Sequence, residues 1–423
     1  MRTGSSDELV SSKASRVLAL QPSCVEFCPA FPSFFLIGTY SLQTDDDAVT
    51  HDDAGVEDED PLPAEPAKAQ SRDGSIIVFR VSDTQDLIEV QSEPQPSAIL
   101  DLHFNPNAGK HDICGAVSST ATLAVFRLSP GEAQTQPLKH LKTMDISTLS
   151  GAKEPPTRVS AVLFLSFCWH PTKAELVGIT TSTGHVYLVN LGSFDENWKL
   201  HSDPVITHTL ESWCVAIRPY LDPAEKPQES GTVFTVLSGG DDSALRFRTC
   251  TYDTSSGVSD DPLPATMVRG HEAGVTAILP LPPTIEVGSP GLVVTGSYDE
   301  YIRLFSITST SAAYDSPKPK CLAESRLGGG VWRLKLIDVD EDASHGYSWR
   351  ARILVSCMHA GVRVVELLRT PGGKYEFVTI GRFEEHQSMN YGSDFQPGWK
   401  DRLFVVSTSF YDKLMCLWEC RMT

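Results

Sequence analysis

The sequence of 423 residues predicts an all-β protein, and more specifically a seven-bladed β-propeller. Three observations lead to this fold. A strand–turn–strand unit recurs seven times, short runs of β-branched and aromatic residues dominate, and no helical periodicity of useful length occurs. The chain is long for one hydrophobic core, but each blade of a propeller adds a small core of its own.

The repeat is clearest in residues 237–247 (LSGGDDSALRF) and 294–304 (VTGSYDEYIRL), where two apolar runs flank a turn that carries aspartate. A third copy spans 406–418, and weaker copies lie at 71–79, 119–126, 181–188 and 356–364. The seven turns fall at Asp73, Thr120, Thr183, Asp242, Asp299, His359 and Asp412. A simple blade needs about 40–45 residues. We therefore expect the surplus length to form polar loops between strands, where insertions are tolerated.

The strands of one repeat predict how the ring closes. In the fifth repeat they lie at 264–268, 275–279, 292–295 and 301–306, and the last repeat ends at its third strand near Trp418. A spare strand at 17–20 precedes the first inner strand at 23–27. We expect this N-terminal strand to complete the last blade, which removes an open sheet edge. The propeller would then span 17–420, with a disordered N-terminus at 1–16 and a disordered acidic insert at 45–70 within blade one.

Charge and hydropathy limit the classes of partner. The net charge is −19, and the stretch 45–60 holds nine acidic residues without Lys or Arg, which is typical of a solvated, disordered segment. No Lys/Arg cluster suited to phosphate groups occurs, so direct nucleic-acid binding is not expected. The longest apolar run, 161–169, is too short to cross a membrane, and no signal-peptide core occurs. We expect a cytoplasmic monomer.

The sequence does not predict a metal or cofactor. Among ten cysteines no CxxC pair occurs, and the pairs Cys24/Cys28 and Cys416/Cys420 fall in expected strands rather than in the turns that hold zinc. Buried thiols in a reducing compartment are the simpler interpretation. No nucleophile elbow, HExxH, Walker or dinucleotide-binding motif occurs. Motifs alone therefore favour a protein-interaction scaffold.

Several polar residues have a structural interpretation as turn anchors. His271 precedes an inner strand, and Asp299 follows in the turn between the second and third strands, so His271 can supply the hydrogen bond that a buried aspartate needs. His386 and Asp412 repeat this layout. We expect His271, Asp299, Asp242 and Asp412 to anchor turns, while His386 has both a structural and a catalytic interpretation.

Four groups of residues go beyond generic repeat chemistry. They are HTLESWCVA (208–216) with SGGDD (238–242), GHEAGVT (270–276) with GSYDE (296–300), LGGGVWRL (327–334), and HQSMNYGSD (386–394) with SFYD (409–412). In this order they resemble the WD-repeat family of diphthine methyl-esterases, over about Glu211 to Trp418. The earlier blades match only as a generic propeller.

The resemblance implies an activity and its partners. The substrate would be a modified histidine on elongation factor 2 that carries a trimethylammonium group and a methyl ester. Hydrolysis would give diphthine and methanol within diphthamide biosynthesis, and other proteins of that pathway would be further partners. Two alternatives stay open: a non-catalytic WD-repeat scaffold for protein–protein interaction, and an adaptor that presents elongation factor 2 to other enzymes.

The four groups map to one face of the expected ring, where ester hydrolysis would need an activated water or nucleophile and donors for the oxyanion. His386 is the candidate base, because imidazole titrates near neutral pH. Ser388 is a candidate nucleophile beside an equally open water mechanism. Asp241 would favour the ammonium group or orient a base, or is a solvated carboxylate. Gly328, Gly329 and Gly330 would offer backbone donors, or form a tight turn that lets Trp332 pack.

Aromatic residues are also expected at this mouth of the channel. They are Trp213, Tyr298, Trp332, Tyr391 and Tyr411. Aromatic faces attract quaternary ammonium groups, so some of these rings would bind the substrate and others would pack within blades. Arg333 would meet the substrate carboxyl group or the surface of the factor.

Overall fold

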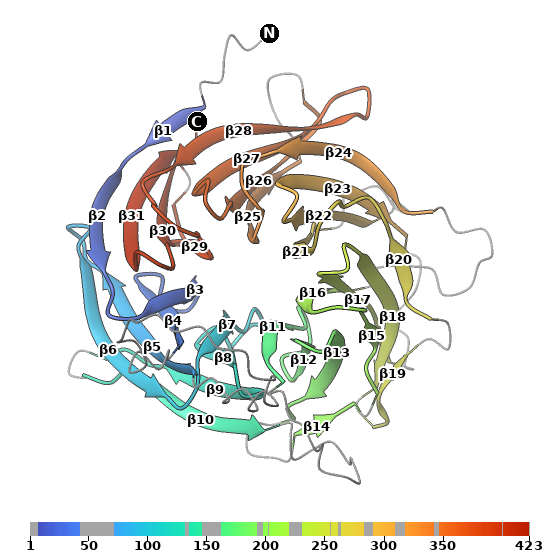
Figure 1. Ribbon diagram of the computed structural model, residues 1–423, viewed down its shortest axis with the longest axis horizontal. Helices are drawn as coiled ribbons and strands as arrows, with labels where there is room; N and C mark the ends of the chain where they lie inside the picture. Colours follow the sequence, from blue (N-terminus) through green and yellow to red (C-terminus); the bar gives the residue numbers. More distant parts are fainter. Residues whose placement is uncertain are drawn as a thin grey trace, which may run out of the picture.

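The computed structural model describes residues 7–42, 72–131, 135–145, 162–192, 198–201, 203–219, 231–253, 255–260, 264–282, 291–308, 318–341, 347–399 and 401–422. Their strands form seven sheets arranged as blades around a central axis (Figure 1), which confirms the seven-bladed propeller. Among these residues no helix has the length and apolar character to span a membrane.

The strands of each blade are given from the channel outward. Blade one contains β3 (Gln21–Phe27), β4 (Phe34–Leu42), β5 (Arg72–Val81) and β6 (Leu87–Gln95). Blade two contains β7 (Ile99–Phe104), β8 (Ile113–Ser118), β9 (Thr122–Leu128) and β10 (Leu138–Asp145). Blade three contains β11 (Phe164–Trp169), β12 (Leu176–Thr181), β13 (His185–Asn190), β14 (Lys199–Leu200) and β15 (Ile206–Thr207). Blade four contains β16 (Ser212–Pro219), β17 (Thr232–Gly240), β18 (Leu245–Asp253), β19 (Gly257–Asp260) and β20 (Thr266–Val268).

The other three blades follow the same order. Blade five contains β21 (Val275–Pro280), β22 (Gly291–Ser297), β23 (Tyr301–Ile307) and β24 (Lys320–Arg326). Blade six contains β25 (Arg333–Asp340), β26 (Trp349–Ser356), β27 (Val362–Arg369), β28 (Tyr375–Phe383) and β1 (Glu8–Val10). Blade seven contains β29 (Gly392–Phe395), β30 (Arg402–Thr408), β31 (Leu414–Arg421) and β2 (Ser12–Val17).

The N-terminus closes the ring, but not with the residues expected. Strand β2 pairs antiparallel with β31, and β1 adds a parallel strand to the outer edge of blade six. The closing strand therefore ends where the expected strand at 17–20 begins. The expectation that 1–16 is disordered is wrong for residues 8–10 and 12–16, which form strands. The segment SKASRV has no apolar run, so pairing with an open edge, rather than intrinsic propensity, makes it a strand. The expected acidic insert at 45–70 lies outside the described residues.

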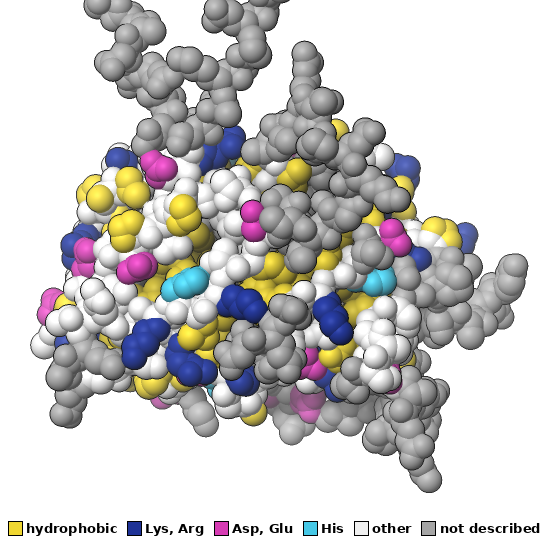
Figure 2. All heavy atoms as spheres, turned by 90° about the horizontal axis from the view of Figure 1, so that it is seen from below, with side chains coloured by type: hydrophobic (Ala, Val, Ile, Leu, Met, Phe, Trp, Pro, Cys, Tyr) yellow, Lys and Arg dark blue, Asp and Glu magenta, His cyan; other side chains and the backbone are white. Residues whose placement is uncertain are grey.

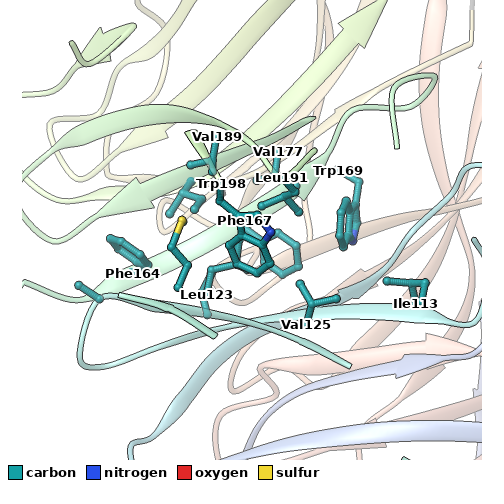
Figure 3. Packing of buried hydrophobic residues seen from close by; sticks show 14 residues of the cluster. Ile113, Leu123, Val125, Phe164, Phe167, Trp169, Val177, Val189, Leu191 and Trp198 are labelled. Atoms are coloured by element: carbon teal, nitrogen blue, oxygen red, sulfur yellow. The ribbon is translucent and has the colours of Figure 1, made fainter. Parts of the chain in front are cut away.

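The hydrophobic core lies between neighbouring blades. In Figure 3, Leu123 and Val125 of blade two face Phe167, Val177 and Val189 of blade three, and all five are buried. Alternate residues of each strand point into such a layer because side chains alternate across a sheet. Replacing one of these aromatic side chains with alanine is expected to cost about 3–5 kcal/mol.

A register shift near the start of the inner strand recurs in blades one to five. In blade four it falls between Ser212 and Cys214, so Trp213 occupies the extra position. In blade five the extra residue is Thr276, whose hydroxyl donates to the carbonyl oxygen of Val331 in the next blade. Bulges of this kind re-aim a side chain, and here they turn single residues toward the channel mouth or the next blade.

One side of the ring carries a mixture of charged and hydrophobic side chains (Figure 2), and the cysteines of the chain are free thiols. Figure 2 shows Lys, Arg, Asp and Glu interspersed with small hydrophobic areas on one side of the ring. All ten cysteines are free thiols, and only Cys321 is exposed. No group of three or more His, Cys, Asp or Glu suited to a metal ion occurs in the described part of the chain.

Candidate active site

A cavity of about 310 Å³ follows the central channel. All seven inner strands, or the residues next to them, contribute to its wall. The charged side chains that line it are Glu26, His103, Arg333 and Lys335, and the indoles of Trp169, Trp213 and Trp332 lie beside them in the wall. The cavity therefore combines charged groups with large aromatic surfaces, which is typical of a ligand-binding site.

An aromatic cluster lies at the channel mouth, and we define it as Trp213, Tyr298, Trp332, Tyr391 and Phe410. The ring centroid of Trp332 lies 5.7 Å from Trp213, 5.9 Å from Tyr298 and 4.9 Å from Tyr391. The rings come from blades four to seven and are half-buried. Four of the five expected aromatic residues thus lie together. Tyr411, which is 67% exposed, contacts only the edge of the cluster through Phe410.

Asp241 fixes one ring of the aromatic cluster. Its Oδ1 accepts a hydrogen bond of 3.0 Å from Trp213 Nε1, which holds the indole that the bulge of β16 aims at the mouth. Burial raises the pKa of Tyr298, and the neighbouring Tyr391, Asp241 and Glu211 raise it further. Two carboxylates therefore lie beside the rings, and together they make the local potential favourable for a cation.

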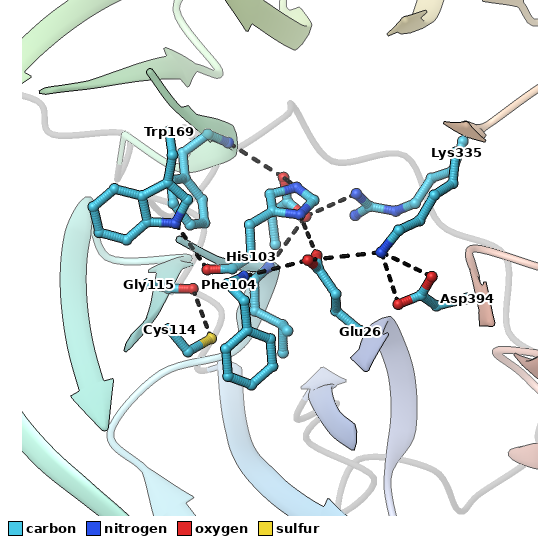
Figure 4. Close-up of polar contacts among 12 residues, drawn as sticks. Glu26, His103, Phe104, Cys114, Gly115, Trp169, Lys335 and Asp394 are labelled. Carbon is cyan, nitrogen blue, oxygen red and sulfur yellow. Dashed lines mark hydrogen bonds and ion pairs between the residues drawn. The ribbon is translucent and has the colours of Figure 1, made fainter. Parts of the chain in front are cut away.

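Deeper in the channel lies a charged belt, which we define as Glu26, Asp101, His103, Arg333, Lys335 and Asp394. It joins blades one, two, six and seven. Figure 4 shows Lys335 between Glu26 and Asp394, with Nζ 2.8 Å from Asp394 and 3.7 Å from Glu26. On the other side of the belt, Arg333 Nη1 lies 2.8 Å from Asp101 Oδ1. Three acidic and three basic groups balance in charge, which offsets part of the cost of removing them from water.

His103 is held between two carboxylates. Its Nδ1 lies 2.5 Å from Glu26 Oε2 and its Nε2 lies 3.2 Å from Asp101 Oδ2. Burial alone would lower the pKa of His103, but Asp101 and Glu26 outweigh it and raise the pKa to about 10. At neutral pH both ring nitrogens therefore donate, and His103 is a cation rather than a base.

The carboxylates of the belt differ in their access to the cavity. Asp101 is fully buried, and although burial opposes its ionisation, Arg333 and His103 hold its pKa well below the ordinary value. Asp394 is also buried, accepts a hydrogen bond from the backbone of Phe27, and has its pKa raised by that burial. Glu26 lines the cavity, and Lys335 and His103 overcome its burial to lower its pKa. Glu26 is thus the belt carboxylate that can meet a molecule in the channel.

His386 and Ser388 lie in the turn framework rather than at the cavity wall. His386 is 6% exposed, and its Nε2 lies 2.7 Å from Ser407 Oγ, which also accepts from Trp418 Nε1. Ser388 Oγ donates to Asp412 Oδ1 over 2.9 Å. Neither residue lines the cavity. The geometry favours the anchoring interpretation of His386 and gives Ser388 the same kind of role.

The glycine run 328–330 forms a close turn. A Cβ on Gly329 would lie 2.2 Å from the carbonyl oxygen of Cys357, so a side chain does not fit there. Val331 N donates to Ser297 O, and Trp332 N donates to Ser356 O. The backbone N–H groups that follow the run are therefore engaged in hydrogen bonds between neighbouring segments of the protein. Gly328 has a φ of 88° and faces solvent. The run is not part of the cavity wall, so its geometry favours the turn that positions Trp332.

The expected turn anchors are present, with one difference. Asp242 Oδ1 lies 2.9 Å from His208 Nδ1, and Asp242 Oδ2 accepts from Arg246. Asp412 accepts from the backbone of Gln387 and from Ser388. Asp299 accepts from the backbone of Glu272 and from Arg303. His271 does not supply that bond and instead contacts Thr295 Oγ1 at 2.9 Å. The arginine four residues after the aspartate takes the place expected for the histidine.

Sequence reasoning missed most of the charged belt. Only Arg333 was a candidate. Glu26, Asp101 and His103 lie in blades that carry weak copies of the repeat, whereas Asp394 ends one of the four special groups of residues and Lys335 directly follows another. A usable signal was present: Asp101 and His103, like Arg333 and Lys335, are spaced by two in inner strands. That spacing places both side chains of each pair on one face of the strand, and charged residues on that face can point into the channel.

The fold and the site define a WD-repeat β-propeller whose channel carries an aromatic mouth and a charged belt. Among solved structures, Sqt1 of Chaetomium thermophilum bound to the N-terminus of the ribosomal protein L10 matches with a TM-score of 0.54 and 11% identity, covering 98% of this chain and all of that one. This likeness shows the fold alone. No family model matches the chain.

Three curated proteins are similar to the chain in sequence. A diphthine methyltransferase homolog of Dictyostelium discoideum is 25% identical over 96% of this chain and 98% of its own length. Diphthine methyltransferase of Schizosaccharomyces pombe is 26% identical over 82% and 86%, and that of Saccharomyces cerevisiae 30% identical over 50% and 49%. The resemblance seen in the sequence is thereby confirmed: the chain is a WD-repeat relative of the proteins of diphthamide biosynthesis that bear this name.

Proposed function

We propose that the chain hydrolyses the methyl ester of methylated diphthine on elongation factor 2, in the cytoplasm, and releases diphthine and methanol. The observation that carries the proposal is that the aromatic cluster and the charged belt border one cavity. The substrate side chain carries a quaternary ammonium and an ester, and these two groups need an aromatic surface and polar catalytic groups, respectively.

The ammonium group binds at the aromatic cluster. Trp213 and Trp332 line the cavity, and Asp241 orients the indole of Trp213. Each aromatic face contributes about 0.5–2 kcal/mol to the binding of a cation. Asp241 and Glu211 add a negative potential without occupying the cavity wall.

The ester is hydrolysed at the charged belt. A water oxygen attacks the carbonyl carbon, and its proton passes to Glu26, the belt carboxylate that lines the cavity. The oxyanion that forms lies near the cations Lys335, Arg333 and His103, which stabilise it. When the C–O bond breaks, the methoxide takes the proton from Glu26, leaving methanol and the carboxylate.

The names of the relatives favour a second candidate, the transfer of a methyl group to diphthine. Hydrolysis removes a methyl group and releases methanol, whereas the transfer adds a methyl group from a donor, so the products separate the two reactions. Elongation factor 2 carrying methylated diphthine with an isotopically labelled ester methyl is incubated with the full chain. Hydrolysis releases labelled methanol and converts the peptide to diphthine, as seen by mass spectrometry.

The result also decides between catalysis and a binding role. If unlabelled diphthine on the factor instead gains a methyl group from an added methyl donor, the chain is a transferase. If the chain binds the factor but neither reaction occurs, the chain is an adaptor. If the chain neither binds the factor nor turns it over, the general scaffold is the remaining interpretation.

A further inference from the structure

Arg333 lies between the two parts of the site. Its Nη1 is 2.8 Å from Asp101 Oδ1 in the charged belt, and its Nε donates over 3.0 Å to the carbonyl oxygen of Tyr391 in the aromatic cluster. The guanidinium is therefore held from both sides, and 25% of the side chain remains accessible. A guanidinium has five N–H groups in a fixed fork, so these two contacts leave donors for a ligand.

Trp332 precedes Arg333 in the chain, and both line the cavity. The Trp332 ring packs 4.9 Å from Tyr391, the residue whose carbonyl holds Arg333. An aromatic face and a fixed cationic donor are thus attached to consecutive residues at the mouth of one cavity. Such a pair matches a ligand that carries a quaternary ammonium and a carboxyl group on neighbouring atoms.

The other cations of the belt are less suited to this role. His103 has a carboxylate at each ring nitrogen, and Lys335 is engaged with Asp394 and Glu26. Lys335 also lies two residues further along β25, away from the aromatic cluster. Arg333 is the belt cation that also contacts the aromatic cluster.

We propose that Trp332 and Arg333 form a subsite for betaines, in which the ammonium lies on the indole and the carboxyl group accepts from the guanidinium. The inference rests on the placement of the substrate's ammonium in the proposed function and names its ligand class. It also goes further, because such a subsite binds small free betaines without the protein that carries the modification.

The purified full chain is titrated separately with glycine betaine, choline and acetate. The intrinsic fluorescence of the channel tryptophans reports the binding. Choline has the ammonium without the carboxylate, and acetate has the carboxylate alone. We expect glycine betaine to bind about tenfold more tightly than choline, and acetate to give no saturable signal. Arg333→Met removes the preference, and Arg333→Lys restores part of it.

Choline serves as the internal control for folding, since a folded Arg333→Met should bind it at least as tightly as the unaltered chain does. Arg326→Met is the matched control: Arg326 is exposed, pairs with Glu300 and does not line the cavity. Equal affinities for betaine and choline in the unaltered chain, or an unchanged preference in Arg333→Met, overturn the inference. Because the titrations involve no turnover, they stand apart from the methanol assay, and either proposal can fail while the other holds.

Discussion

The imidazole of His103 in blade two and the carboxylate of Glu26 in blade one form an ion pair at 2.5 Å inside the channel. The same imidazole contacts Asp101, and Asp101 reaches Ser166 of blade three and Arg333 of blade six. One histidine thus belongs to a network that crosses the channel and ties distant blades together. The charge on His103 therefore bears on the stability of the ring as well as on the site.

The first prediction concerns alkaline pH. The pKa of His103 is raised to about 10 from an ordinary value of 6.5, so its protonation stabilises the folded state. That contribution is complete below about pH 6.5 and is lost as the pH rises toward 10. We expect the thermal unfolding midpoint of the unaltered chain to fall more steeply between about pH 6.5 and pH 10 than the midpoint of His103→Gln, which has no imidazole to titrate. Parallel midpoint curves for the two proteins would show that the pair carries no linked proton.

The second prediction tests the buried carboxylate of the belt. Asp101→Ala leaves Arg333 and His103 without their shared partner and is expected to cost about 3 kcal/mol of unfolding free energy. Urea denaturation measures the loss. Asp112→Ala is the control, because Asp112 pairs with Arg127 at the surface and is expected to cost less than about 1 kcal/mol. Similar losses in both variants would contradict a stabilising belt.

The sequence predicted the propeller because the turn chemistry is local: the aspartate turns of blades four, five and seven are each contained within a few residues. It also placed Trp213, Tyr298, Trp332 and Tyr391 at one mouth, since strand order fixes which turns share a face. The belt could not be assembled this way. The contact of Glu26 with His103 depends on the rotation between two blades, and β2 is a strand only because β31 offers it an edge.

The third prediction concerns His386. Burial lowers its pKa to about 4, and the imidazole is neutral in the folded state near pH 7. Stability from this group is present above about pH 6.5 and is lost as the pH falls toward 4, where the unfolded chain binds a proton first. His386→Ala should lower stability near pH 7 by about 1–3 kcal/mol and weaken that acid dependence. Methanol release per folded molecule should persist, and its complete loss in a stable variant would restore His386 as a base.

The fourth prediction separates binding from chemistry in the proposed reaction. Trp332→Ala should mainly raise KM, because the indole contacts the ammonium in both ground and transition states. Glu26→Gln should lower kcat by about 100-fold or more, because the amide cannot take the proton of water. Steady-state methanol release measures both. Trp399→Ala, an exposed indole outside the cavity wall, is the control. A Glu26→Gln variant with unaltered kcat would remove Glu26 from the reaction.

The fifth prediction distinguishes a structural from a catalytic role for the glycine run. A methyl group on Gly329 would meet the carbonyl oxygen of Cys357 and the side chain of Ala360, and backbone cannot move aside cheaply. Gly329→Ala is therefore expected to cost about 1–3 kcal/mol of stability. Gly372→Ala, whose added methyl would meet nothing closer than 3.9 Å, should be nearly neutral. If the run also supplied oxyanion donors, the folded fraction of Gly329→Ala would lose kcat as well, whereas a purely structural role leaves the activity per folded molecule unchanged.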